Sequence, residues 1–317
     1  MKLCQLVFLW PDVPFSPVPD PPIVYKSVLR YNYSMIHRKL LLFCVLPLLL
    51  QACESLNPKS RLVKIQSAQV YYTYKILLTP DHPDSPKLEI ALSLFQIRYP
   101  QAQTAFVNQV LYSGSNPDSY KDKVVKEQRE RYRKSLSYLA EIDSENLKIY
   151  DEDGVEIEDL ETSNWHYTEN FAPIRPRSRG VIIERTKETY TGGAHGMKTT
   201  QYYVIDLESQ KLLRIDDFLK DYQGDLIRDY IYDELRNYSG LNKNQPLSEG
   251  IYLNDEPELT FNFFINEDGL CLHWDPYEIA PYSEGAIQVT LPWKKIRPLL
   301  MNNGMELLAK FNILLFV

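Results

Sequence analysis

Two short segments contain the residue types that could bind or react with a ligand. One is the run DPYEIAPYSEG at 275–285, in which tyrosine, glutamate and proline lie close together. The other is TGGAHG at 191–196, where a histidine lies among three glycines. Tyrosine offers a large contact area at a small loss of conformational entropy, and a nearby carboxylate adds a polar group. We therefore predict a partner-binding site formed by Tyr277, Glu278, Pro281, Tyr282 and His195.

Both segments also allow a purely structural interpretation. The tyrosine rings could pack inward and hold a tight connection together, and the glycines could form a turn with a hydrogen-bonded His195. A third interpretation is a hydrolase, in which Glu278 and either Asp275 or Glu284 act as an acid/base pair. Carboxylates this close together occur by chance in an acidic protein, so the hydrolase is not favoured.

Other catalytic and metal-binding patterns are absent from the sequence. His82, His166 and His273 form no H-E-x-x-H motif. No Gly-Lys-Ser/Thr follows the glycines, which argues against a phosphate-binding loop. The segment 151–161 is acidic but lacks the regular spacing of a calcium loop, so we expect a turn there. We therefore expect no metal, no cofactor and no enzymatic activity.

The composition is that of a globular protein with many tyrosines. Of 317 residues, 44% are hydrophobic, 24% are charged and 23 are tyrosine. The formal charge of −7 provides no basic excess for nucleic acid. It is compatible with a cationic protein partner. No two of the four cysteines have metal-ligand spacing, and we expect Cys271 to be buried in a strand.

The segment 35–52 has the organisation of a bacterial lipoprotein signal peptide. A basic triplet precedes a short apolar core, and Leu-Gln-Ala precedes Cys53 as in a lipobox. We expect Cys53 to carry lipid and 53–65 to be a tether; an uncleaved signal anchor is the alternative. Because 1–34 precedes a complete signal peptide, we expect it to be a non-native extension. The protein would then be an exported envelope lipoprotein, facing the periplasm or lying at the outer membrane in a Gram-negative cell.

Apolar periodicity predicts the elements that position the two segments. Strands are expected at 70–78, 88–97, 165–174, 181–189, 199–206, 260–265, 270–274 and 286–291. Helices are expected at 101–111, 119–142, 215–219, 224–238 and 293–301. The charge run in the second helix is expected to be a solvated face rather than a ligand-binding patch. Asp268-Gly269 between two strands predicts a hairpin.

These elements predict an α+β fold with two modules, each an antiparallel sheet with helices on one face. The first module spans 66–175 and the second 176–302, and the two could share one core. The remaining tail, 303–317, ends in an apolar run.

The sequence resembles a pair of bacterial extracytoplasmic domains of poorly defined function. They form the outer part of RsiV-type anti-sigma factors and lie beside the catalytic domain of PdaC-type peptidoglycan deacetylases. The matching residues are Tyr99-Pro100, TGGAHG, the strand-turn-helix at 204–219, and above all FFINEDGL through DPYEIAPYSEG to VTLP at 263–292. The resemblance covers roughly 66–300.

The resemblance implies binding rather than catalysis. The RsiV-type outer region is similar to a lysozyme receptor. This sequence contains neither a sigma-binding domain nor a polysaccharide-deacetylase domain, so those activities are not expected. The expectation is a lipid-anchored module that binds a lysozyme-like glycosidase or a peptidoglycan-related ligand. A structural envelope protein without a ligand is the alternative.

Overall fold

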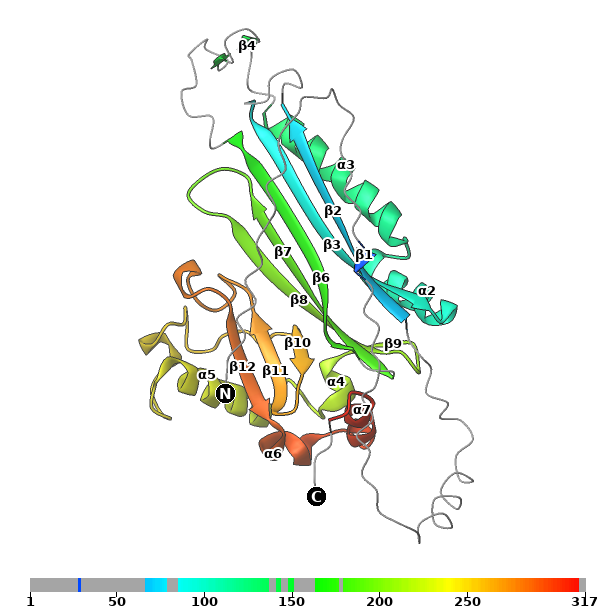
Figure 1. The fold of residues 1–317 in the computed structure, drawn as a ribbon. Coiled ribbons are helices and arrows are strands. Elements are labelled where there is room, and N and C mark those ends of the chain that lie inside the picture. The colour runs from blue at the N-terminus through cyan, green and yellow to red at the C-terminus, as the bar shows by residue number, and fades with distance from the viewer. Residues whose placement is uncertain are drawn as a thin grey trace, which may run out of the picture.

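The computed structural model describes residues 28–29, 66–78, 85–136, 141–143, 148–150, 163–176 and 179–313 (Figure 1). They form a large sheet, a three-stranded sheet and a two-stranded ribbon with helices, which confirms the predicted α+β class. The expected signal peptide, the tether with Cys53 and the acidic segment 151–161 lie outside the described residues. Within the described ranges, the helices are too short or too polar to cross a membrane.

A mixed sheet of seven strands forms the centre of the molecule. In chain order, its strands are β1 (Val28–Leu29), β2 (Gln66–Leu77), β3 (Lys87–Tyr99), β6 (Trp165–Pro176), β7 (Gly180–Tyr190), β8 (Met197–Asp206) and β9 (Lys211–Leu213), and they are hydrogen-bonded in this same order. The pairs are antiparallel except β3 with β6, which is parallel. We expected antiparallel sheets only, so the parallel β3–β6 pair corrects that prediction. It arises because two helices lie between β3 and β6 in the chain, and a parallel pair needs such a crossover.

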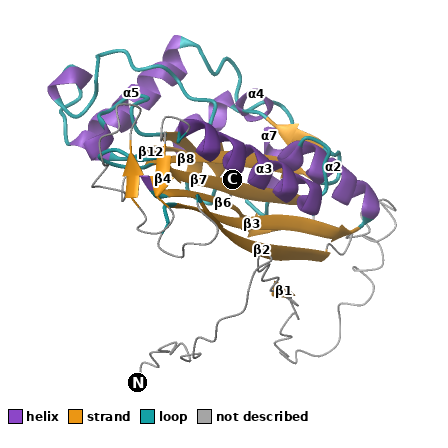
Figure 2. Ribbon diagram, turned by 90° about the horizontal axis from the view of Figure 1, so that it is seen from above, coloured by secondary structure: helices purple, strands orange, loops and turns teal. Residues whose placement is uncertain are grey.

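The crossover helices cover one face of the large sheet (Figure 2). They are α2 (Gln101–Tyr112) and α3 (Pro117–Ser135), and their buried residues join those of β3 in one core. The Asn116 side chain accepts a hydrogen bond from Ser119 N at 2.9 Å, and Pro117 follows at the first helical position. Both features favour a helix start here, because they satisfy or remove unpaired N–H groups. The prediction of a helix over 119–142 was wrong at its end, since α3 stops at Ser135 and the ribbon of β4 (Glu141–Asp143) and β5 (Lys148–Tyr150) follows.

A second core lies against the opposite face of the large sheet. It contains the three-stranded sheet and the helices around it. The strands are β10 (Phe263–Ile265), β11 (Gly269–Trp274) and β12 (Ile287–Pro292), and the helices are α4 (Ile215–Phe218), α5 (Asp225–Ser239), α6 (Trp293–Ile296) and α7 (Gly304–Lys310). Figure 1 shows this group beside the lower half of β7 and β8. The predicted strand over 260–265 begins later than expected, at Phe263.

The strands β7 and β8 belong to both cores. Val181 and Ile183 pack with α2 and α3, whereas Ile182 between them packs with the small sheet. Alternation along a strand sends neighbouring side chains to opposite faces, which explains this division. We expected the first module to end at residue 175. In the structure, residue 175 lies in β6, which pairs with β7, so the large sheet continues past this boundary.

The hairpin predicted at Asp268-Gly269 joins β10 to β11. The Asn266 side chain accepts hydrogen bonds from Asp268 N and Gly269 N, both at 2.9 Å. A Cβ at Gly269 would overlap the Leu291 carbonyl oxygen of β12, so a larger residue would separate the strands. This turn fixes the register of β11 and therefore the position of the loop that follows it.

The tail beyond residue 302 packs against the large sheet. Phe311 is fully buried, and a Cβ at Gly180 would lie 2.6 Å from its ring. The Lys310 ammonium donates to Asp206 Oδ2 at 2.7 Å. The sequence left the role of this tail open, and the structure makes its described part, 303–313, a component of the second core.

Candidate functional site

The loop between β7 and β8 carries His195. Gly192 and Gly193 have φ angles of 91° and 90°, which favour glycine. A Cβ at Gly196 would lie 2.8 Å from the Thr189 carbonyl oxygen, so this position also requires glycine. The His195 side chain is exposed, and its Nδ1 lies 2.9 Å from Gly196 O. The glycines thus form the tight turn that the sequence indicated.

The connection between β11 and β12 carries the other predicted residues. Glu278 accepts a hydrogen bond from Asp275 N at 2.7 Å, and Tyr277 N donates to Ala280 O at 3.1 Å. Ile279 and Ala280 are buried and anchor the connection in the second core. Tyr277 is 51% exposed.

Tyr277 adopts a φ of 74°, a left-handed backbone conformation that is unfavourable for an aromatic residue. The surrounding turn holds it there, since the residues on both sides are hydrogen-bonded within the connection. Backbone strain of this kind gathers at functional positions more often than elsewhere.

Asp275 ties this connection to the large sheet. Its Oδ1 accepts a hydrogen bond from Thr200 N of β8 at 2.8 Å and lies 3.1 Å from His273 Nε2. Asn262 makes the equivalent contact two residues further along β8, where its Oδ1 accepts a hydrogen bond from Tyr202 N at 2.9 Å. Backbone groups at this end of β8 are therefore satisfied by two side chains that flank strands of the small sheet, Asn262 before β10 and Asp275 after β11, since the short β9 reaches only the other end.

The two loops meet in an aromatic cluster of His195, Tyr277 and Tyr282. The ring centroids of His195 and Tyr282 lie 3.8 Å apart with an interplanar angle of 15°. Those of Tyr277 and Tyr282 lie 5.6 Å apart at 32°. The Tyr282 hydroxyl donates to Gly196 O at 2.8 Å, which joins two loops that are 86 residues apart in the chain.

The structure therefore brings together three of the five predicted binding residues. Glu278 and Pro281 are exposed beside the cluster, but the Glu278 carboxylate also caps its own turn. The structural interpretation required the tyrosine rings to pack inward. The rings of Tyr277 and His195 are instead exposed and lie outside the core. Partner binding by these residues stays a prediction, as does the hydrolase alternative.

Beside Asp275 lies His273, which is buried in β11 at 5% exposure. Its Nε2 faces Asp275, and its ring contacts the Tyr202 ring edge-on at a centroid distance of 5.5 Å. Its Nδ1 has no hydrogen-bond partner among the described residues. His273 positions Asp275 rather than facing a ligand. Among the described residues, no group of histidine, cysteine and carboxylate side chains has the arrangement of a metal site.

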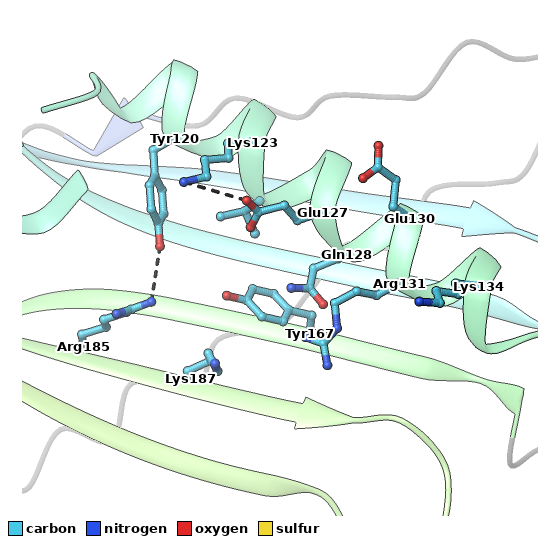
Figure 3. A pocket seen from close by; sticks show the side chains of 11 residues that line it. Tyr120, Lys123, Glu127, Gln128, Glu130, Arg131, Lys134, Tyr167, Arg185 and Lys187 are labelled. Carbon is cyan, nitrogen blue, oxygen red and sulfur yellow. Dashed lines mark hydrogen bonds and ion pairs between the residues drawn. The ribbon is translucent and has the colours of Figure 1, made fainter. Parts of the chain in front are cut away.

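A groove elsewhere on the molecule was missed by the sequence interpretation. It lies between α3 and the strands β6 and β7, has a volume of about 550 Å³, and contains none of 275–285 in its lining (Figure 3). Its helical side comes from the charge run that we expected to be a solvated face. The only sequence indication was the recurrence of charged residues of both signs at three- and four-residue intervals (Lys123, Glu127, Glu130, Lys134), which places them on one side of a helix.

Comparisons with known proteins find one family model that matches part of the chain. Residues 216–294 match the model described as "Protein of unknown function (DUF3298)". No curated protein matches the chain. The fold is similar to the crystal structure of a DUF3298 family member from Bacteroides fragilis, with a TM-score of 0.66, 17% identity, and coverage of 78% of this chain and 98% of that one.

A DUF3298 family protein from Pseudomonas aeruginosa is 15% identical, with a TM-score of 0.46 and coverage of 76% of this chain and 95% of that one. The matched segment 216–294 includes the hairpin and the connection that carries Tyr277 and Tyr282, whereas His195 lies outside it. The chain thus contains a DUF3298 domain at 216–294, a domain of unknown function.

Proposed function

We propose that the protein is an envelope-facing binding protein, anchored by lipid at Cys53, that captures a lysozyme-like glycosidase. The observation that carries this proposal is the aromatic cluster. Three partly or fully exposed rings from two distant loops are in contact: His195 stacks on Tyr282, and Tyr277 packs against Tyr282 at a tilt. The Tyr282 hydroxyl joins the two loops through its hydrogen bond to Gly196 O. A rigid group of exposed aromatic rings is the typical centre of a protein-binding surface.

The strained backbone of Tyr277 supports binding over a structural role. A left-handed tyrosine destabilises the fold by about 1–2 kcal/mol relative to an ordinary conformation. Glycine would remove that strain, as it does at Gly285, which has a φ of 69° in the same connection. A tyrosine ring that is half exposed at a strained position is therefore better explained by a contact with a partner.

Charge supports a basic partner. The connection 275–285 contains three carboxylates and no lysine or arginine. The exposed Glu278 and Glu284 lie next to the aromatic rings. Acidic groups around an apolar contact steer a cationic protein towards it and exclude anionic ones. Lysozyme is basic, and the resemblance to RsiV-type outer regions points to the same partner.

Binding measurements with the lipid-free protein test the proposal. Surface plasmon resonance against lysozymes of several classes should detect a complex, and Tyr282→Ala should weaken it by roughly tenfold. Tyr71→Ala, which removes a partly exposed ring from β2, is the matched control and should leave the affinity unchanged. Tyr282→Phe keeps the ring and removes only the hydrogen bond to Gly196, so it should have a smaller effect than alanine.

Two outcomes would overturn the proposal. One is the absence of binding to any lysozyme class, and the other is an equal loss of affinity for Tyr282→Ala and Tyr71→Ala. Soluble peptidoglycan fragments form a second arm of the same experiment. If they bind at the aromatic cluster and lysozymes do not, the ligand is the glycan itself rather than the enzyme that cleaves it.

A further inference from the structure

The groove between α3 and the large sheet has a floor built around one buried carboxylate. Glu169 of β6 is fully buried, and its Oε1 accepts a hydrogen bond from Arg185 Nε at 2.7 Å. The hydroxyls of Tyr120 and Tyr167 donate to Oε1 and Oε2 at 2.9 and 3.0 Å. Burial, followed by the charge of Glu169, raises the pKa of both tyrosines, so both remain donors at neutral pH.

This floor is balanced in charge. Arg185 pairs with Glu169 in two contacts, through Nε and through an NH2 group at 2.5 Å. Buried charges are stable only when paired and hydrogen-bonded, and this pair meets both conditions. Glu169 is therefore already neutralised by Arg185, and no further cation is needed to balance it.

The lining of the groove has more cationic than acidic side chains. Its lining contains five cationic side chains and two carboxylates: Lys123, Arg131, Lys134, Arg185 and Lys187 with Glu127 and Glu130. Glu127 is paired with Lys123 at 3.8 Å, and Glu130 is paired with Lys126 at 4.0 Å. Arg131 and Lys187 have no ion-pair partner in the described part of the chain. Figure 3 shows them on opposite sides of the groove, one from α3 and one from β7.

Helix and strand geometry explain why these two groups converge. The lining residues of α3 recur at three- and four-residue intervals and so share one side of the helix. Lys187 lies directly opposite Glu169 in the β6–β7 register and therefore shares its face of the sheet. Tyr167, Val124 and the stem of Gln128 supply apolar surface between them.

We infer that this groove binds an organic oxyanion, a carboxylate or phosphate attached to a ring or other apolar group. Arg131 and Lys187 hold the oxyanion from two sides, since guanidinium and ammonium groups are the usual donors to such anions. The apolar part of the ligand lies against Tyr167 and Val124. The volume of about 550 Å³ is that of a small-molecule site. In a chain of formal charge −7, a lining with five cationic side chains and two carboxylates is a local exception, and an anionic ligand at Arg131 and Lys187 explains it.

Ligand-observed NMR and calorimetry on the whole protein test this inference with four probes. Benzoate and phenyl phosphate should bind, and benzyl alcohol, which has the ring without the charge, should not. A preference for one of the two anions identifies the oxyanion. Inorganic phosphate should bind more weakly than phenyl phosphate because it has no ring. Affinity should fall as salt is added, because the site is partly open to solvent.

Two matched variants locate the site. Arg131→Gln and Lys187→Gln should each weaken binding by roughly tenfold or more. Arg133→Gln removes the same charge from α3 outside the groove lining and should change the dissociation constant less than about twofold. These side chains are exposed or lie at the rim, so the variants should remain folded.

Three results would overturn the inference: no binding of either organic anion, equal affinities for phenyl phosphate and inorganic phosphate, or an Arg133→Gln effect as large as that of Arg131→Gln. None of these results bears on the aromatic cluster, because the groove lining contains none of its residues.

Discussion

The aromatic cluster and the cationic groove are built in opposite ways. The cluster consists of two loops joined by stacked rings and hydrogen bonds to backbone atoms, with acidic side chains around it. The groove consists of a helix and two strands, with a buried ion pair beneath a basic rim. The cluster is suited to a basic partner and the groove to a small anion. One chain can therefore present two sites of opposite charge because they lie on different layers of the fold.

The largest expected effect tests whether the buried ion pair beneath the groove stabilises the fold more than a surface ion pair does. Glu169→Gln should lower the free energy of unfolding by about 3 kcal/mol, because the partly buried Arg185 loses the charge of its fully buried partner. Glu188→Gln removes a carboxylate that pairs with Lys198 on the surface of β7, and it should change stability by less than about 0.5 kcal/mol. Urea denaturation measures both. Similar values for the two variants would show that the groove floor is not a stabilising centre.

A third ion pair, between Asp206 and Lys310, tests whether another buried carboxylate also stabilises the fold through its charge. Burial alone would raise the pKa of Asp206, but hydrogen bonds from Lys310 and Ser209 outweigh it and lower the pKa. A carboxyl group with a lowered folded pKa stabilises the protein above its unfolded pKa and loses that contribution as pH falls through the folded pKa.

Asp206→Asn should therefore cost about 2 kcal/mol at pH 7. The difference from the native protein should shrink as the pH is lowered below about 4. Asp229→Asn, at an exposed position on α5, serves as the control and should be close to neutral at both pH values. A difference that stays constant with pH would mean that Asp206 acts through packing alone. Unfolding at pH 7 and pH 3 is the measurement.

The sequence predicted those parts of the fold that depend on neighbouring residues. The β10–β11 hairpin, the long strands β2 and β3, and α5 follow from turn residues and apolar periodicity. The parallel pairing of β3 with β6 could not be predicted, because it depends on where α2 and α3 return the chain. The end of α3 at Ser135 was missed because Leu136, Leu139 and Ala140 continue the apolar periodicity of the helix in the sequence.

The two candidate sites differ in the same way. The residues of the cluster were selected because each loop has an unusual local composition, although their contact across 86 residues required the structure. The groove had no local indication on the sheet side. Glu169 and Arg185 meet only because of the β6–β7 register, and Tyr120 reaches them from α3. A charge run on a helix is usually solvated, and only the tertiary fold shows which side of it faces a groove.

The smallest expected effect separates the backbone of Tyr277 from its ring. Tyr277→Gly and Tyr277→Ala both remove the contact with Tyr282, which is exposed and weak, but only glycine accommodates the φ of 74° without strain. The glycine variant should therefore be more stable than the alanine variant by about 1 kcal/mol, measured by thermal or urea unfolding. Both should bind the partner less tightly than the native protein, so the more stable variant would still be impaired in binding. If alanine proved as stable as glycine, the backbone at Tyr277 would carry no strain, and the cluster would rest, like the groove, on its side-chain contacts alone.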